Sequence, residues 1–344
     1  MQLIRRKAYA RAGLVGNPSD GYHGKTISIS VTNLAAEVVL YEWDRVEVVL
    51  SQEDRSAFRS VHELVDDVQL HGYYGGVRLV KATIKRFVDF CRSSGLSLHR
   101  RNFAVRYQTS IPRQVGLGGS SAIIVATLRA LMEFYEVDIP LELRPSLALS
   151  VETDELGIAA GLQDRVIQVY EGAVFMDFAR ERMQTTSGLT YGAYESLDPA
   201  RLPPLYVAYR ADASEPTEKV HNDLRQRYER GDADVLAAMS RWAELATEAR
   251  DAILAGDGDR LGRTIDENFD LRRNLLTIPK RQQQMVDVAR QCGATAKFAG
   301  SGGAIVGTYP DPAAYQQLVK QLGMIGCRVL KPRMIPTKTA ASGA

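Results

Sequence analysis

The chain has 344 residues, of which 45% are hydrophobic and 24% are charged. This length predicts two domains or one large one with a buried core, and the composition excludes disordered, collagen-like and low-complexity classes. Lys and Arg number 43 against 41 Asp and Glu, so the net charge of +2 indicates no nucleic-acid or membrane partner and favours a small-molecule ligand.

The cysteine pattern and the apolar segments bear on the compartment. Cys91, Cys292 and Cys327 are widely spaced, without a CxxC, which argues against a disulfide framework or a zinc site and favours a reducing compartment. The basic N-terminal stretch lacks an apolar run after it, and no 18 apolar residues occur together. We therefore expect a cytoplasmic protein.

The first part of the chain predicts strands followed by helices. Period-two alternation at 27–31, 37–41 and 46–50 predicts three short strands of an antiparallel meander. Apolar residues at i, i+3, i+4 and i+7 spacing from Val77 to Cys91 predict an amphipathic helix that stops near Gly95. A strand follows, with Phe103, Val105 and Tyr107 on one face. After a glycine-rich turn, 122–135 is apolar nearly all round, as in a helix buried between layers, and 141–155 predicts a further helix closed by Gly157.

The second part of the chain continues with separate strands and helices. Residues 173–178 and 205–209 predict strands, and the polar stretch 180–204 between them suggests the change of domain. Helical periodicity over 218–256 is broken at Gly256-Asp-Gly258, and a helix, a glycine-rich turn and a strand recur over 282–309. Because strands and helices are segregated rather than strictly alternating, the predicted class is α+β.

The most informative segment is a glycine-serine loop between a predicted strand and a predicted apolar helix. It reads Pro112-Arg-Gln-Val-Gly-Leu-Gly-Gly-Ser-Ser-Ala122. At such a turn, free backbone N–H groups and the positive end of the helix form a site for phosphate. Gly116, Gly118 and Gly119 permit close approach of the backbone, and Ser120 and Ser121 offer a helix cap and hydroxyls for phosphate or metal. We predict a nucleotide site, the alternative being a serine-capped turn without a ligand.

Two common phosphate loops do not fit this segment. There is no GxxxxGK followed by Ser or Thr, and the sixth position of GxGxxG counted from Gly116 is Ser121, so a P-loop and a Rossmann hydride-transfer enzyme are disfavoured. A second glycine cluster, Lys297-Phe-Ala-Gly-Ser-Gly-Gly-Ala304, also precedes a predicted strand. From its residues alone, this cluster could equally be a plain connection between helix and strand.

Three segments together resemble the motifs of the GHMP kinases. Residues 112–122 are similar to their middle motif, Ala10-Arg-Ala-Gly-Leu-Val-Gly-Asn-Pro-Ser-Asp20 to their first, and 297–303 to their third, in the right order. Within the family, 9–20, 111–122, 161–165, 219–221 and 269–273 are most similar to the glucuronokinases. The resemblance implies a two-domain α+β fold: an N-terminal ATP-binding domain over 1–190 with a left-handed βαβ crossover, and a ferredoxin-like C-terminal domain over 191–335. We expect 336–344 to be a flexible tail.

The resemblance also implies the roles of the chemical groups. Asp164 corresponds to the catalytic carboxylate that accepts or orients the sugar proton, and Arg11 to the basic residue between it and the γ-phosphoryl. Mg²⁺ would be held by Glu152 with a hydroxyl of Ser120 or Ser121, which is left open. Glu152 and Asp164 are twelve residues apart, with glycines between them that break the helix. The ATP-binding residues implied are Pro112, Gly116, Leu117, Gly118, Gly119, Ser120, Ser121 and Ala122.

The sugar site follows from the same resemblance. Asp20 corresponds to the family's sugar-binding aspartate, and the implied substrate-binding set is Asn17, Asp20, Tyr22, Gly161, Gln163, Gly300, Ser301 and Gly302. A uronic acid needs a cation for its carboxylate, ideally a bidentate guanidinium. Arg113, Arg272, Arg273 and Lys25 are all candidates, and the sequence does not choose among them.

These observations lead to one expected activity and two alternatives. We expect an ATP- and Mg²⁺-dependent kinase that phosphorylates the anomeric hydroxyl of D-glucuronate, with ATP and the sugar as its only implied partners. The first alternative is a kinase for another aldose, such as galactose, arabinose or a heptose. The second is a sensor that binds nucleotide or sugar without transfer. Oligomeric state and base preference stay open.

Overall fold

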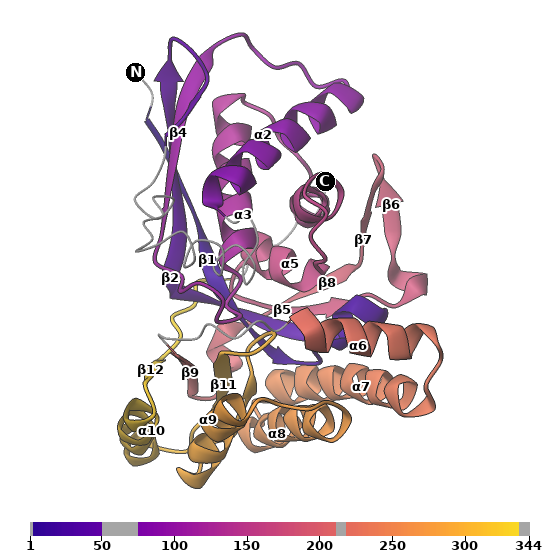
Figure 1. Ribbon diagram of the computed structural model, residues 1–344, viewed down its shortest axis with the longest axis vertical. Helices are drawn as coiled ribbons and strands as arrows, with labels where there is room; N and C mark the ends of the chain where they lie inside the picture. The colour runs from indigo at the N-terminus through magenta and orange to yellow at the C-terminus, as the bar shows by residue number, and fades with distance from the viewer. Residues whose placement is uncertain (1–2, 50–74, 211–217, 337–344) are drawn as a thin grey trace, which may run out of the picture.

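A computed structural model describes residues 3–49, 75–210 and 218–336. It contains two main sheets, one formed by strands within residues 3–197 and one by strands within residues 205–330 (Figure 1). Residue 50 of the expected third strand and residues 337–344 of the expected tail lie outside the described residues. In the described ranges, no helix is both long enough and apolar enough to span a membrane.

The first sheet is built around one long strand. Strand β2 (Lys25–Trp43) pairs with β1 (Leu3–Val15) along one edge, and with β4 (Asn102–Thr109) and β5 (Ala173–Asp177) along the other. The order β3-β4-β2-β5-β8 is completed by β3 (Glu47–Val48) and β8 (Ala193–Leu197), with β1 off this path. All pairings are antiparallel except β3 with β4. This arrangement sets residues from β1 and β2 beside those of the later helices.

The expected meander is wrong. The strands expected at 27–31 and 37–41 are two parts of β2, and the third pairs parallel to β4. The register with β1 shifts between Tyr9 and Ala10, which pair with Ala35 and Val31, so residues 32–34 bulge out of the ladder. The backbone N–H of Thr32 donates instead to the carbonyl of Arg333. The bulge interrupts the side-chain alternation and therefore mimics a turn in the sequence.

The helices of the first half cover one face of this sheet (Figure 1). They are α2 (Gly76–Ser93), α3 (Gly119–Phe134), α4 (Arg144–Ser150) with a π-helical turn (Val151–Glu155), and α5 (Leu162–Tyr170). Helix α3 packs between the sheet and its neighbouring helices and is buried on nearly all sides, which confirms the prediction from its apolar sequence. Helix α2 connects the parallel strands β3 and β4, but the hand of this crossover involves residues outside the described ranges.

The second sheet has the ferredoxin-like arrangement. Its strands β9 (Leu205–Arg210), β10 (Lys297–Phe298), β11 (Ala304–Thr308) and β12 (Cys327–Leu330) are ordered β10-β11-β9-β12 and are all antiparallel. Helices connect β9 to β10 and β11 to β12, and a glycine loop connects β10 to β11, which gives the split βαββαβ pattern. The helices are α6 (Glu218–Glu229), α7 (Ala233–Ala255), α8 (Gly258–Leu275), α9 (Lys280–Gln291) and α10 (Pro312–Met324). The expected two-domain α+β architecture is therefore confirmed.

The polar stretch 180–204 is more structured than its composition suggests. It contains the hairpin β6 (Gln184–Thr186) and β7 (Leu189–Tyr191), and strand β8, which pairs with β5. The first sheet thus extends to Leu197, beyond residue 190, where we expected the first domain to end. The position of that domain boundary stays a prediction. The part of the chain that the structure describes also contains three short 3₁₀ turns: Ser19–Tyr22, Arg180–Arg182 and Pro199–Arg201.

Candidate active site

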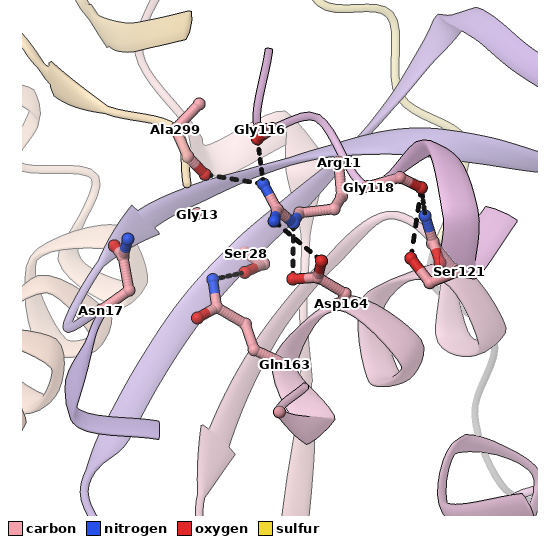
Figure 2. A network of polar contacts seen from close by, with 12 residues as sticks. Arg11, Gly13, Asn17, Ser28, Gly116, Gly118, Ser121, Gln163, Asp164 and Ala299 are labelled. Carbon is pink, nitrogen blue, oxygen red and sulfur yellow. Dashed lines mark hydrogen bonds and ion pairs between the residues drawn. The ribbon is translucent and has the colours of Figure 1, made fainter. Parts of the chain in front are cut away.

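A buried ion pair lies where the two glycine clusters meet (Figure 2). Arg11 on β1 donates from Nε and Nη2 to the two carboxylate oxygens of Asp164, at 2.7 and 2.8 Å. Its Nη1 donates to the carbonyls of Gly116 at 2.5 Å and Ala299 at 2.9 Å. Only 6% of Arg11 is exposed. One guanidinium therefore holds a carboxylate and a peptide carbonyl from each glycine loop in a fixed arrangement.

The surroundings of Asp164 keep its carboxyl group ionised. Asp164 is in the first turn of α5, which begins after the N-cap Gly161. Burial by itself would raise the pKa of Asp164, but the charge and hydrogen bonds of Arg11, with the nearby charge of Arg165, lower it below its usual value. The positive end of the helix acts in the same direction. A carboxylate held in this form can accept a proton or a hydrogen bond from a substrate hydroxyl.

A cavity of about 410 Å³ opens beside this pair and is lined from both halves of the chain. Its walls come from β1, the 3₁₀ turn after it, the segment leading into α5, helices α6 and α8, and the loop after β10. The predicted site residues that line it are Arg11, Asn17, Asp20, Tyr22, Glu152, Gly161, Gln163, Asp164, Arg272, Gly300 and Ser301. The structure therefore brings together side chains from widely separated parts of the sequence.

The second acidic group in the cavity, Asp20, differs from Asp164 in its ionisation. Burial raises the pKa of Asp20 to about 7, and the negative charge of Asp164 adds to this effect. The backbone of Gly161 lies against it, because a Cβ at that position would be 2.9 Å from Oδ2 of Asp20. The two aspartates thus give the cavity one carboxylate that is ionised and one that binds a proton near neutral pH.

One buried cation at this site was not predicted from the sequence. Arg165 follows Asp164 directly, lines the cavity and is 5% exposed. Its Nη2 donates to Oε2 of Glu152, the residue expected to bind Mg²⁺. Arg165 stands in the segment 161–165, which the family resemblance includes. The sequence does not indicate whether the side chain of an arginine next to a catalytic candidate points into the site. Arg225, on α6, is a further cation that lines the cavity and was not predicted.

The predicted nucleotide loop lies next to the cavity, not in its lining. Gly116 has a φ of +70°, and a Cβ there would be 2.7 Å from the carbonyl oxygen of Gly302, so the two glycine loops touch. The backbone N–H of Arg11 donates to the carbonyl of Leu117. Together with the bond from Nη1 of Arg11 to Gly116, this contact attaches the loop to the ion pair.

The start of helix α3 departs from the expectation in one respect. Its N-cap is Gly118, with a φ of +74°, and no side chain caps it. The expected serine cap is therefore wrong: the left-handed backbone at the cap requires glycine, and the Ser121 hydroxyl donates back to the carbonyl of Gly118. Gly119, Ser120 and Ala122, which were also predicted to bind ATP or its metal, are in this first turn, and Pro112 is in the loop that precedes it.

The four candidate partners for a uronate carboxylate are separated by the fold. Arg113 is exposed and does not line the cavity. Lys25 pairs with Asp177 at 3.5 Å, and Arg273 pairs with Asp270 at 3.3 Å.

Arg272 is the one of the four that lines the cavity. It is buried, and its two Nη atoms donate to the carbonyls of Gly300 and Ser301 at 3.2 and 3.1 Å. Burial lowers the pKa of this guanidinium to about 10.

Several other predicted binding residues have defined partners. Lys297, at the start of the third motif, is 1% exposed and donates to the carbonyl of Gly13 at 2.6 Å and to Oδ1 of Asn17 at 2.5 Å. Gln163 donates to the hydroxyl of Ser28 at 2.8 Å, as Figure 2 shows. The ring of Tyr22 packs 4.6 Å from that of Tyr228. Gly302 is outside the cavity lining.

Known proteins resemble this chain along nearly its whole length. Residues 78–172 match the GHMP kinases N terminal domain, and residues 249–323 match the GHMP kinases C terminal domain. Glucuronokinase 1 of Arabidopsis thaliana is 41% identical over 98% of this chain and 93% of its own length. The probable glucuronokinase 2 of the same plant is also 41% identical, over 99% of this chain and 94% of its own length.

The solved structures place the fold in the same group. The phosphomevalonate kinase of Streptococcus pneumoniae superimposes with a TM-score of 0.76 at 16% identity, covering 97% of this chain and all of that one. Sequence similarity along nearly the whole chain, two matching domains and a shared fold lead to one conclusion. The chain belongs to the GHMP kinase family, a family of small-molecule kinases.

Proposed function

We propose that the chain is an ATP-dependent sugar kinase that transfers a phosphoryl group to the anomeric hydroxyl of D-glucuronate, releasing ADP and glucuronate 1-phosphate. The observation that carries this proposal is the bidentate pair of Arg11 and Asp164 beside a cavity of about 410 Å³. The choice of glucuronate is supported by the 41% identity to glucuronokinases along nearly the full length of both chains.

Asp164 acts as the base in the proposed reaction. The anomeric oxygen forms a bond to the γ-phosphorus, the bond from that phosphorus to the bridging oxygen breaks, and ADP leaves. The proton of the anomeric hydroxyl moves to the Asp164 carboxylate, which Arg11 holds ionised. Because both Nε and Nη2 of Arg11 bind this carboxylate, its orientation is set before substrate arrives.

ATP supplies the phosphoryl group, and Mg²⁺ neutralises charge on its phosphates. The glycine loop over 116–121, which begins α3, would hold the phosphates through its backbone N–H groups. Ser120 or Ser121 and Glu152 would hold the metal, which in such sites takes its other ligands from phosphate and water. The carboxylate of Glu152 suits this role because it lines the cavity and its bond to Arg165 uses only Oε2.

Asp20, Asn17, Gln163 and Tyr22 are proposed to bind the sugar hydroxyls. They line the same cavity as Asp164 and carry both donors and acceptors. A protonated Asp20 would donate a hydrogen bond to a sugar oxygen, and an ionised one would accept a bond from a hydroxyl. We also propose a cytoplasmic location, supported by three cysteines that are buried and free of disulfides.

A substrate screen tests this proposal. ADP release is measured by a coupled assay with D-glucuronate, D-galacturonate, D-galactose, L-arabinose and a heptose, and the position of the phosphate is read by phosphorus NMR. We expect turnover on D-glucuronate with phosphate on the anomeric oxygen. Turnover on neutral sugars only would reject the substrate, and ligand binding without any ADP release would reject the kinase in favour of a sensor.

A further inference from the structure

We propose that Arg272 binds the carboxylate of the sugar substrate and thereby selects uronic acids over neutral aldoses. This inference rests on the proposed function and names the group that recognises the substrate. Arg272 belongs to α8 in the second half of the chain, whereas Asp164 belongs to α5 in the first half. Both line the same cavity, so one substrate could contact both.

The guanidinium of Arg272 is held in place but still has donors for a ligand. It uses two of the five N–H groups of an arginine on the carbonyls of Gly300 and Ser301, which leaves three. Its central carbon lies 5.2 Å from the centre of the Phe298 ring, which restricts the plane of the group. The side chain is therefore pre-arranged for a planar acceptor such as a carboxylate.

The charge of Arg272 has no acidic partner among the residues that the structure describes. Its interactions are the two carbonyls and the aromatic ring, and only 5% of the residue is exposed. A buried guanidinium that is not paired with an anion is costly, and an arriving anion would remove much of this cost. The lowered pKa that burial causes, to about 10, still leaves the group charged at neutral pH.

The other cations at the cavity are already engaged or exposed. Arg11 binds both oxygens of Asp164 and two carbonyls, and Arg165 binds Glu152. Arg225 is 62% exposed in its side chain and pairs with Glu229 at 3.7 Å, and Lys297, which does not line the cavity, donates to three oxygens. Of the cations that line the cavity, Arg272 is therefore the buried one best able to donate hydrogen bonds to the carboxylate of a substrate.

The position of Arg272 relative to the ion pair fits a single hexuronate. Arg11 binds the carbonyl of Ala299, and Arg272 binds the carbonyl of the next residue, Gly300. The two guanidiniums therefore hold consecutive peptide groups of one loop. In a pyranose uronate, the anomeric carbon and the carbon that bears the carboxylate are both attached to the ring oxygen. A sugar with its anomeric hydroxyl at Asp164 would thus direct its carboxylate to a nearby group.

The test compares D-glucuronate with D-glucuronamide, in which a neutral amide replaces the carboxylate. The quantity measured is the ratio of kcat/KM for glucuronate to that for glucuronamide, in the wild type, Arg272→Gln and Arg272→Lys. For Arg272→Gln we expect the ratio to fall by about 10- to 150-fold, the range for losing hydrogen bonds to a charged group. Arg272→Lys keeps the charge without the planar fork and should give an intermediate ratio.

The matched control is Arg273→Gln. Arg273 is the next residue on the same helix, is exposed and pairs with Asp270 outside the cavity, so its ratio should equal that of the wild type. Where a variant turns over too slowly for kcat/KM to be measured, the dissociation constants of glucuronate and glucuronamide give the ratio instead. They are measured by calorimetry in the presence of a non-hydrolysable ATP analogue. If Arg272→Gln fails to fold, Arg272→Lys supplies the decisive ratio.

The possible outcomes separate the inference from the proposed function. An unchanged ratio with weaker binding of both sugars would show that Arg272 only holds the glycine loop, and would overturn the inference. An increase confined to the KM for ATP would assign the guanidinium to phosphate, and would overturn it as well. Absence of wild-type turnover on any uronate or aldose would instead reject the proposed function.

Discussion

Replacement of Asp164 by asparagine tests the central ion pair directly. The amide is isosteric with the carboxylate, but its NH₂ group would face one of the two Arg11 N–H groups that now bind a carboxylate oxygen. One hydrogen bond is therefore lost, and Arg11 keeps its charge with only the carbonyls of Gly116 and Ala299 and the remaining amide oxygen as acceptors.

The magnitude follows from the burial of the pair. Breaking a buried ion pair by removing one partner typically costs about 3–5 kcal/mol. Here the Asp164 side chain is 22% exposed and Arg11 retains two carbonyl acceptors, so we expect the free energy of unfolding to fall by about 2–4 kcal/mol. Turnover should fall by about 10²- to 10⁴-fold, the usual contribution of a positioned base.

The two effects are measured separately. Urea denaturation, followed by the fluorescence of buried Trp242, gives the free energy of unfolding, and ADP release gives turnover. The control is Asp251→Asn, whose pair with Arg250 spans 3.4 Å at an aspartate side chain that is 50% exposed. That change should cost no more than about 1 kcal/mol and leave turnover unaffected.

The pH dependence gives a further check with a defined sign. The folded pKa of Asp164 is lowered, so its stabilisation is present above the unfolded pKa of about 4 and is lost as the pH falls through the folded value. The stability difference between the wild type and Asp164→Asn should therefore shrink below about pH 4.

Two results for Asp164→Asn would refute the role given to the ion pair. They are a turnover within tenfold of the wild type, or a stability loss no larger than that of Asp251→Asn.

Three further predictions concern other parts of the site. The pKa of Asp20 is raised from 3.8 to about 7, so the stability of the wild type should decline as the pH rises from about 4 to about 7. The stability of Asp20→Asn relative to the wild type, measured in urea titrations, should therefore be greater at about pH 8 than at about pH 5, by up to about 3 kcal/mol. Gly116→Ala should weaken binding of a fluorescent ATP analogue, since the new Cβ would lie 2.7 Å from a carbonyl oxygen, whereas Gly95→Ala, which meets open space at the same φ, should not. Lys297→Met leaves three oxygens without their donor and should lower the unfolding free energy by about 2–5 kcal/mol in the same titrations, and a loss under 1 kcal/mol would contradict this.

Much of the local structure could be predicted from the sequence, because periodicity and glycines report on backbone geometry directly. The amphipathic pattern from Val77 to Cys91 predicted α2, and the apolar segment after Ser121 predicted the buried helix α3. The pattern failed where a bulge at 32–34 makes one strand look like two. It also failed at the polar stretch 180–204, where β8 pairs with the earlier strand β5 and β6 forms a short hairpin with β7.

Some residues of the candidate site could likewise be predicted from the sequence, and others could not. The motifs indicated Arg11, Asp164 and Asp20, since each stands in a recognisable segment. They did not indicate Arg165 or Arg225, and they left four cations as equal candidates for a uronate carboxylate. The fold separates those four because burial and pairing depend on which elements pack together, and Arg272 alone of them lines the cavity.

The sequence by itself determined the α+β class and the two glycine loops, because these depend on residue types at short spacing. Its resemblance to the GHMP kinases indicated the chemical groups that we propose for phosphoryl transfer. Only the tertiary structure decided which charges are paired, which are buried without an acidic partner, and which meet in one cavity. Arg11 and Asp164 are 153 residues apart, and Arg11 and Ala299 are 288 apart. The first contact arises because α5 packs against β1, and the second because β1 lies beside the second sheet, and no local pattern in the chain records either packing.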